Sequence, residues 1–150
     1  MVYLILGCGW IGEALANILL EEGHQVYAST TNEQKYQRLQ AAGIFAVWAD
    51  FDVEIATDAF PKEVDFVLNS IPSVKRLPEE QLKRRFQRLY ALLLRTSYKK
   101  HIFLSSIGTY PDIDGMYAED YKLEFVANNL LLAESILSGL PDSIVYRLGG

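Results

Sequence analysis

The segment from Gly7 to Gly12, with the sequence GCGWIG, limits what this chain can fold into more than any other feature. It follows the apolar run Val2–Leu6, which is typical of a strand buried on both faces, and it precedes apolar residues at helical spacing. In such a strand–turn–helix unit, Gly7 permits the tight turn, Gly9 lets the backbone approach a ligand, and Gly12 lets the helix pack close to the strand. The N-terminus of the helix then offers free N–H groups to an anion. The segment therefore predicts a cradle for the diphosphate of NAD(P).

Three variable positions lie inside this loop. Trp10 and Ile11 stand at the start of the predicted helix, and we expect both beside the cofactor. Trp10 either covers the diphosphate or packs on the helix, and the sequence leaves both arrangements open. For Cys8, neither a neighbouring base nor a second cysteine is evident, so we interpret it as a space-filling residue rather than a nucleophile.

Strands and helices alternate along the rest of the chain. This order implies right-handed crossovers and predicts an α/β fold, a doubly wound parallel sheet of the Rossmann type with three αβα layers. Strands are expected at 2–6, 25–29, 44–48, 64–68, 101–105 and 143–148, and helices at about 11–22, 32–42, from 78 onward, and 119–138. We expect residues 1–150 to form one dinucleotide-binding domain, with the remainder of the fold and its substrate contacts beyond Gly150.

The end of the second predicted strand bears on the choice of cofactor. NAD-selective folds usually carry an Asp or Glu there, which bonds the ribose 2′-hydroxyl. This chain has Ser29, Thr30 and Thr31 instead. Hydroxyl groups, with Lys35 or Arg38 on the next helix, suit a 2′-phosphate, so we predict NADP, with NAD as the alternative. The other interpretation is that these residues, with Asn32, only cap the helix.

Asp50 stands just past the third predicted strand, on the edge of the sheet where the adenine end of a dinucleotide lies. Its carboxylate either binds the adenine amino group or caps the following turn at 52–56.

Charge and composition narrow the class of partner. A net charge of −5 gives no basic field for a phosphate backbone, which argues against nucleic acid. The chain has no basic leader and no apolar stretch of about 18 residues, so we expect a cytoplasmic protein without a membrane association.

Four apolar residues of the helix that opens at Pro78 are interpreted as core or homodimer-interface positions: Leu82, Phe86, Leu89 and Leu93.

Several segments, in chain order, resemble the extended and atypical short-chain dehydrogenase/reductases, the family of the NAD-dependent epimerase/dehydratases. They are the glycine loop, the run 69–72 (NSIP), the run 103–110 (FLSSIGTY) and the closing 146–150 (YRLGG). The third is similar to the family's SSxxxYG, with Pro111 in place of the glycine. The resemblance implies cofactor contacts from Asn69 and Ser70. It also implies a small carbonyl or a nucleotide sugar as the substrate.

The resemblance assigns catalytic roles only in part. It places Ser106 on the reacting oxygen, because the family carries a Ser or Thr four residues before this tyrosine; the alternative is a serine that caps local backbone. The family's base is a Tyr followed by Lys four residues later, and no tyrosine of this chain has that partner. The corresponding positions fall on Val126 and Leu130. Tyr117 and Tyr121 are the candidates to replace the missing phenol, although either can instead be a surface tyrosine.

Two functions therefore stay open at the level of sequence. One is an atypical NAD(P)-dependent epimerase or reductase in which Ser106 orients the substrate oxygen. The other is a non-catalytic NAD(P)-binding sensor or scaffold, which the missing Tyr-Lys pair favours. A third, weaker interpretation is that the glycine loop relates the chain to hydroxyacid and prephenate-type dehydrogenases. The serine and tyrosine of the run 103–110 argue against this interpretation.

Overall fold

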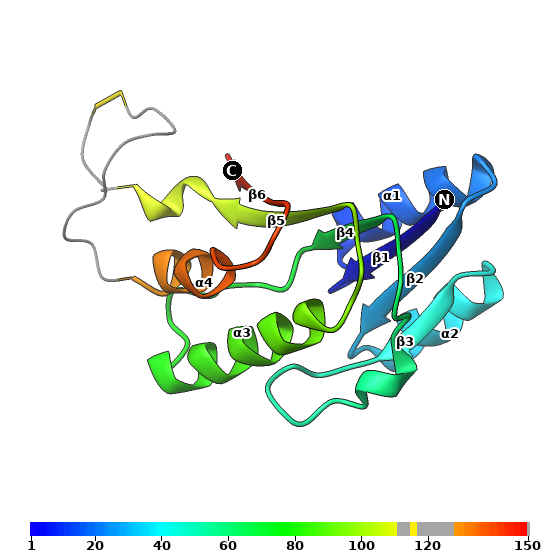
Figure 1. Ribbon diagram of the computed structural model, residues 1–150, viewed down its shortest axis with the longest axis horizontal. Coiled ribbons are helices and arrows are strands. Elements are labelled where there is room, and N and C mark those ends of the chain that lie inside the picture. The colour runs from blue at the N-terminus through cyan, green and yellow to red at the C-terminus, as the bar shows by residue number, and fades with distance from the viewer. Residues whose placement is uncertain (111–114, 117–127, 150) are drawn as a thin grey trace.

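The computed structural model describes residues 1–110, 115–116 and 128–149, and shows a sheet with helices on both faces (Figure 1). The strands are β1 (Val2–Leu6), β2 (Gln25–Thr30), β3 (Phe45–Trp48), β4 (Phe66–Asn69), β5 (Lys100–Ser106) and β6 (Ser143–Leu148). The α-helices are α1 (Trp10–Glu21), α2 (Glu33–Ala41), α3 (Glu79–Leu94) and α4 (Asn129–Leu137), with short 3-10 helices η1 (Thr57–Ala59) and η2 (Ile107–Thr109).

The six strands lie in the order β3-β2-β1-β4-β5-β6, and every neighbouring pair is parallel. This confirms the predicted doubly wound sheet. The chain moves outward from β1 to β3 and then crosses to β4 on the other side of β1. In open parallel sheets, ligands bind at such a reversal, outside the carboxyl ends of the strands. The register pairs Leu6 of β1 with Asn69 of β4 at that edge.

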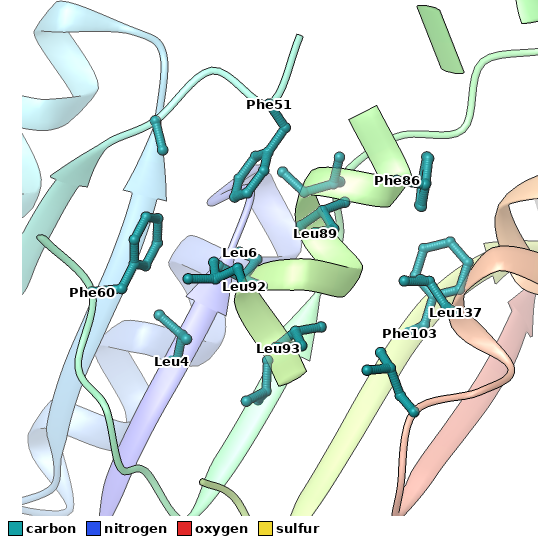
Figure 2. Packing of buried hydrophobic residues seen from close by; sticks show 14 of the residues in the cluster. Leu4, Leu6, Phe51, Phe60, Phe86, Leu89, Leu92, Leu93, Phe103 and Leu137 are labelled. Atoms are coloured by element: carbon teal, nitrogen blue, oxygen red, sulfur yellow. The ribbon is translucent and has the colours of Figure 1, made fainter. Parts of the chain in front are cut away.

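Two apolar clusters fill the space between the sheet and the two helical layers. One joins α1 and α2 to β1 and β2, with Ala16, Leu19 and Leu39 at its centre. The other lies under α3 and α4 (Figure 2). The four apolar residues of α3 singled out above are at most 1% exposed: Leu82, Phe86, Leu89 and Leu93. They are core residues, which is the first of the two interpretations given above.

Element boundaries follow local signals closely. The strands at 2–6 and 143–148 are as predicted, and Asn32 caps α2 by accepting a hydrogen bond from Lys35 N at 2.8 Å. Strand β4 begins two residues later than expected, because Val64 N donates to Ser97 O before the ladder starts. The predicted start of the last helix, near Glu119, lies outside the described residues. Within those residues, no helix combines the length and apolar character that a bilayer crossing needs.

Candidate functional site

The glycine loop forms a tight turn between β1 and α1 that other residue types would disturb. Gly7 has φ +74°, and a Cβ there would lie 2.9 Å from the Ile71 side chain and 3.1 Å from its backbone nitrogen. At Gly12, a Cβ would lie 2.9 Å from Ile5 on β1. At Gly9, by contrast, a Cβ would meet nothing within 4 Å. Two of the glycines thus serve packing, while the third leaves open space in front of the helix N-terminus.

A cavity of about 490 Å³ opens beside this loop, at the carboxyl ends of β1, β2, β3 and β4. It lies where the topology predicts a ligand. Its lining comes from the glycine loop, from the end of β2, from the loops after β3 and β4, and from α3. The residues are Gly7, Cys8, Gly9, Ser29, Thr30, Thr31, Ala49, Asp50, Phe51, Asp52, Ser70, Ile71, Pro72 and Arg85.

The hydroxyl groups at the end of β2 line the cavity, and two of them also hold local backbone. Ser29 Oγ accepts a hydrogen bond from Gly7 N at 2.9 Å, and Thr30 Oγ1 accepts one from Asn32 N at 3.2 Å. Thr31 is exposed at the rim. The bonds of Thr30 and Asn32 agree with the capping interpretation, whereas Ser29 holds the glycine loop instead of the helix. All three residues at the end of this strand still line the cavity.

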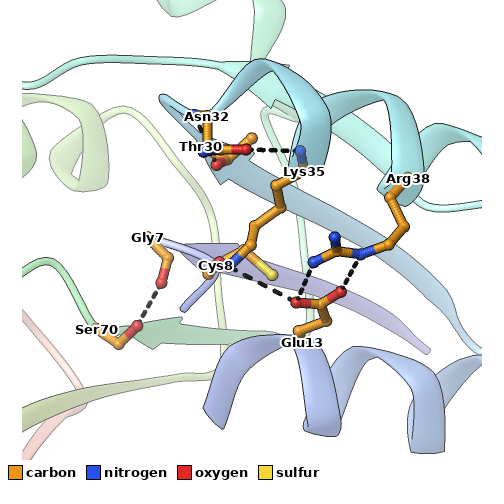
Figure 3. Close-up of polar contacts among 8 residues, drawn as sticks. All are labelled: Gly7, Cys8, Glu13, Thr30, Asn32, Lys35, Arg38 and Ser70. Atoms are coloured by element: carbon orange, nitrogen blue, oxygen red, sulfur yellow. Dashed lines mark hydrogen bonds and ion pairs between the residues drawn. The ribbon is translucent and has the colours of Figure 1, made fainter. Parts of the chain in front are cut away.

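Lys35 and Arg38 meet Glu13 beside the glycine loop (Figure 3). Lys35 Nζ donates to Cys8 O at 2.9 Å, while Arg38 gives Glu13 two hydrogen bonds, at 2.7 and 2.9 Å. These bonds to Arg38, with the positive charges nearby, hold the pKa of the Glu13 carboxyl below its usual value. The cluster therefore carries two positive charges and one negative charge.

The floor of the cavity is fixed by an ion pair that the sequence did not reveal. Asp52 accepts hydrogen bonds from Arg85 and from Gln81, both on α3. The bonds to Arg85 lower the pKa of the Asp52 carboxyl. Arg85 also donates to Pro72 O at 2.7 Å, so one side chain ties together the loops after β3 and β4. Asp50 lines the cavity and accepts from Asp52 N at 2.9 Å, which is the capping role considered above.

Asn69 and Ser70, at the end of β4, differ in what they contact. Ser70 Oγ donates to Gly7 O at 2.5 Å and joins the loop after β4 to the glycine loop. Asn69 is fully buried, and its Oδ1 accepts from Ile71 N at 3.1 Å. Its Nδ2 has no partner within the described ranges. Ser70 therefore faces the site, whereas Asn69 shapes the loop from below.

Trp10 and Ile11 border a second, smaller cavity on the other side of the glycine loop. This space of about 220 Å³ is lined by Gly9, Trp10, Ile11, Ser70, Leu104 and Leu148. Trp10 is 81% exposed, so it does not pack tightly on its helix. Cys8 is buried, and burial raises the pKa of its thiol to about 11, which agrees with a space-filling role.

Ser106 ends β5 at the same edge of the sheet. Its Oγ accepts a hydrogen bond from Gly108 N at 3.1 Å, and its hydroxyl proton has no acceptor among the residues that the structure describes. Of the two positions that align with the family's Tyr-Lys pair, Leu130 is buried in α4 and Val126 lies outside the described residues. Tyr117 and Tyr121 lie outside them as well.

A polar network beside Ser106 joins α4 to β5 and β6. Glu134 accepts from Ser105 Oγ at 2.6 Å and from two nitrogens of Arg147. Arg147 also donates to the Tyr110 hydroxyl at 2.9 Å and lies over its ring. The hydrogen bonds to Glu134 raise the pKa of the Arg147 guanidinium. This network fixes the strand end that carries Ser106.

A family model places the chain among known proteins. The model described as "NAD dependent epimerase/dehydratase family" matches residues 3–131. Protein YeeZ of Escherichia coli K12 is 27% identical over 156 residues, which cover 97% of this chain and 57% of YeeZ. The chain thus spans a little over half the length of the curated relatives that it matches.

Solved structures share the fold. A putative NAD-dependent epimerase/dehydratase from Bacillus halodurans superposes with a TM-score of 0.70 at 23% identity, over 99% of this chain and 70% of that one. The UDP-glucuronic acid 4-epimerase from Bacillus cereus, solved with NAD, gives a TM-score of 0.73 at 16% identity, over 99% of this chain and 56% of that one.

Proposed function

Because the chain belongs to the NAD dependent epimerase/dehydratase family, we propose that it binds NAD(P) in the 490 Å³ cavity. The diphosphate lies on the glycine loop, and the adenosine end lies toward Asp50. The observation that carries this proposal is the open space at Gly9, beside the N-terminus of α1 and at the reversal of strand order. Free N–H groups and the positive end of the helix dipole stabilise an anion there.

Substitution of Gly9 tests this placement. Its φ of −78° suits alanine, and a Cβ would meet no protein atom within 4 Å. Gly9→Ala should therefore change the free energy of unfolding by less than about 1 kcal/mol. It should nevertheless weaken dinucleotide binding at least about tenfold, because the methyl group occupies the space of the diphosphate. Isothermal titration of wild type and variant measures this. A variant that binds as tightly as wild type would contradict the placement.

The second element of the proposal is a preference for NADP over NAD. The end of β2 has no carboxylate to bond a ribose 2′-hydroxyl, and it carries Thr30 and Thr31 at the cavity. Lys35 and Arg38, one turn into α2, supply positive charge nearby. Dissociation constants for NADPH and NADH, measured side by side, test this preference. Tighter binding of NADH would overturn it while leaving dinucleotide binding intact.

For the chemistry, we propose an epimerase- or reductase-type reaction on a small carbonyl or a nucleotide sugar. A bound nicotinamide supplies hydride transfer. Ser106 donates its hydroxyl proton in a hydrogen bond to the substrate oxygen, while Gly108 N holds the Oγ in place. Tyr117 or Tyr121 exchanges the proton. Among the structural neighbours, the Bacillus cereus enzyme was solved with UDP-glucuronic acid and NAD, which supports the nucleotide-sugar class.

A second candidate is a sensor or scaffold that binds the dinucleotide without turnover. It is favoured by the absence of any tyrosine with lysine four positions later, and by the buried leucine at position 130. NADPH oxidation across a panel of carbonyls tests for reduction, and chromatographic separation of nucleotide-sugar isomers tests for epimerisation, which consumes no net NADPH. Together the two assays separate the hypotheses. The enzyme hypothesis expects turnover that falls in Ser106→Ala and in Tyr117→Phe or Tyr121→Phe. Cofactor binding without turnover, or turnover indifferent to all three changes, would favour the alternative.

A further inference from the structure

The carboxylate of Glu13 lies beside the glycine loop, next to the proposed cofactor site. Glu13 lies in the first turn of α1, just after the glycine loop, and its side chain is 23% exposed. It accepts two hydrogen bonds from Arg38, and its Oε2 lies 3.6 Å from Lys35 Nζ. Glu13 on α1 thus interacts with both cationic side chains of α2, Lys35 and Arg38, as Figure 3 shows.

Lys35 brings this cluster to the cavity. Its ammonium donates to the carbonyl of Cys8, a residue that lines the cavity, and its backbone nitrogen is bonded by the Asn32 cap. Thr30 and Thr31, which also line the cavity, precede that cap directly. Lys35 therefore lies beside the glycine loop and the end of β2, where a doubly wound fold places the adenosine ribose, and Glu13 joins Arg38 to it.

The charges in the cluster do not cancel. Two cations and one carboxylate leave a net charge of +1 beside the cavity, which attracts a 2′-phosphate. A 2′-phosphate that approached Lys35 and Arg38 would compete with Glu13 for their N–H donors, because both acceptors are anionic and use the same charge-assisted bonds. A ribose 2′-hydroxyl carries no charge and enters no such competition.

We propose that Glu13 is a specificity-determining residue, which positions Lys35 and Arg38 and, by sharing them, limits the preference for NADP over NAD. This inference rests on the proposed dinucleotide binding. The glutamate keeps the two cations ordered before a dinucleotide binds. It also reduces the affinity that they would otherwise give to a 2′-phosphate.

The experiment measures dissociation constants of NADPH and NADH for wild type and variants at two salt concentrations. Glu13→Gln should tighten NADPH binding by about fivefold to tenfold, through loss of the competing charge. NADH binding should stay within about twofold, and the gain for NADPH should shrink in high salt. Lys35→Gln should weaken NADPH by about tenfold and spare NADH.

Two controls keep the result interpretable. Glu13→Asp retains the charge and should restore the wild-type ratio, whereas Glu21→Gln removes an exposed carboxylate at the far end of the same helix and should change neither constant. Thermal unfolding of each variant confirms folding. Unchanged NADPH-to-NADH ratios in a folded Glu13→Gln variant would overturn the role of Glu13 alone. Failure of wild type to bind either dinucleotide would overturn the proposed function, and this inference with it.

Discussion

Arg85 forms a bidentate ion pair with Asp52, in which Nε and Nη2 each donate to one carboxylate oxygen at 2.7 Å. The two residues are 33 positions apart, and their side chains are only 13% and 24% exposed. Since Arg85 also reaches Pro72 O, the pair fixes the floor of the cavity to α3.

Removal of the guanidinium should weaken both the fold and the site. Arg85→Met is expected to cost about 2 kcal/mol of unfolding free energy, because it leaves the partly buried Asp52 carboxylate without its main partner. It should also weaken dinucleotide binding, since Arg85 no longer connects the loops after β3 and β4 that line the cavity. Urea denaturation and titration measure the two effects. Arg84→Met is the matched control, because within the described part of the chain Arg84 bonds only the carbonyl of Glu80 at the exposed surface of the helix. Equal stability of the two variants would contradict the structural role of the pair.

Gly7→Ala and Gly23→Ala form a pair that separates backbone strain from crowding. Both glycines have positive φ, +74° and +82°, so alanine should cost about 1 kcal/mol at each from conformation alone. Only at Gly7 would the new methyl group crowd Ile71. We therefore expect Gly7→Ala to cost about 1–2 kcal/mol more than Gly23→Ala. Chemical denaturation measures the difference, and indistinguishable values would show that the loop relaxes freely.

His101 should make stability depend on pH. It is fully buried, and burial lowers its pKa from 6.5 to about 4. Between these values the unfolded chain binds a proton that the folded chain does not, so stability should fall as pH drops from about 6.5 toward 4. The loss attributable to this group approaches about 3 kcal/mol. Unfolding of wild type and His101→Gln at several pH values isolates it. The variant should lose this part of the slope, and parallel curves would contradict the assignment.

The adjacent serines at the end of β5 should behave differently. Ser105 is 7% exposed and donates to Glu134 at 2.6 Å, so Ser105→Ala should destabilise by about 1.5 kcal/mol. Ser106 accepts only a local backbone bond among its described contacts, so Ser106→Ala should cost less than about 1 kcal/mol. If the enzyme hypothesis holds, turnover should fall mainly in Ser106→Ala. A greater loss of turnover in Ser105→Ala, at equal folded fraction, would move the catalytic assignment away from Ser106.

Much of the fold follows from local patterns in the sequence. The apolar run Val2–Leu6 and the glycines after it determine a buried strand and its turn without reference to distant residues. Asn32 is a second example, because its cap involves only the next three positions. The doubly wound parallel sheet follows from the alternation of strands and helices and from the handedness of crossovers. These features could be predicted because each depends on few neighbours.

The polar architecture of the site could not be read in the same way. Arg85 belongs to the run of three basic residues at 83–85, in which Lys83 pairs with exposed glutamates. Arg85 turns inward because α3 lies beside the loop that carries Asp52. The pairing of Glu13 with Arg38, 25 positions away, likewise depends on how α1 and α2 pack. Such partners are set by tertiary placement, which no local spacing encodes.

The buried thiol of Cys8 lies in the turn that forms the proposed diphosphate cradle. With its pKa raised from 9.0 to about 11, the sulfur carries about a hundredfold less thiolate at neutral pH than an unshifted cysteine would. Peroxides and alkylating agents should therefore attack this protein slowly while the loop keeps its shape. Because Cys8 is the only cysteine of the chain, the rate at which it becomes labelled would report directly how often the glycine loop opens.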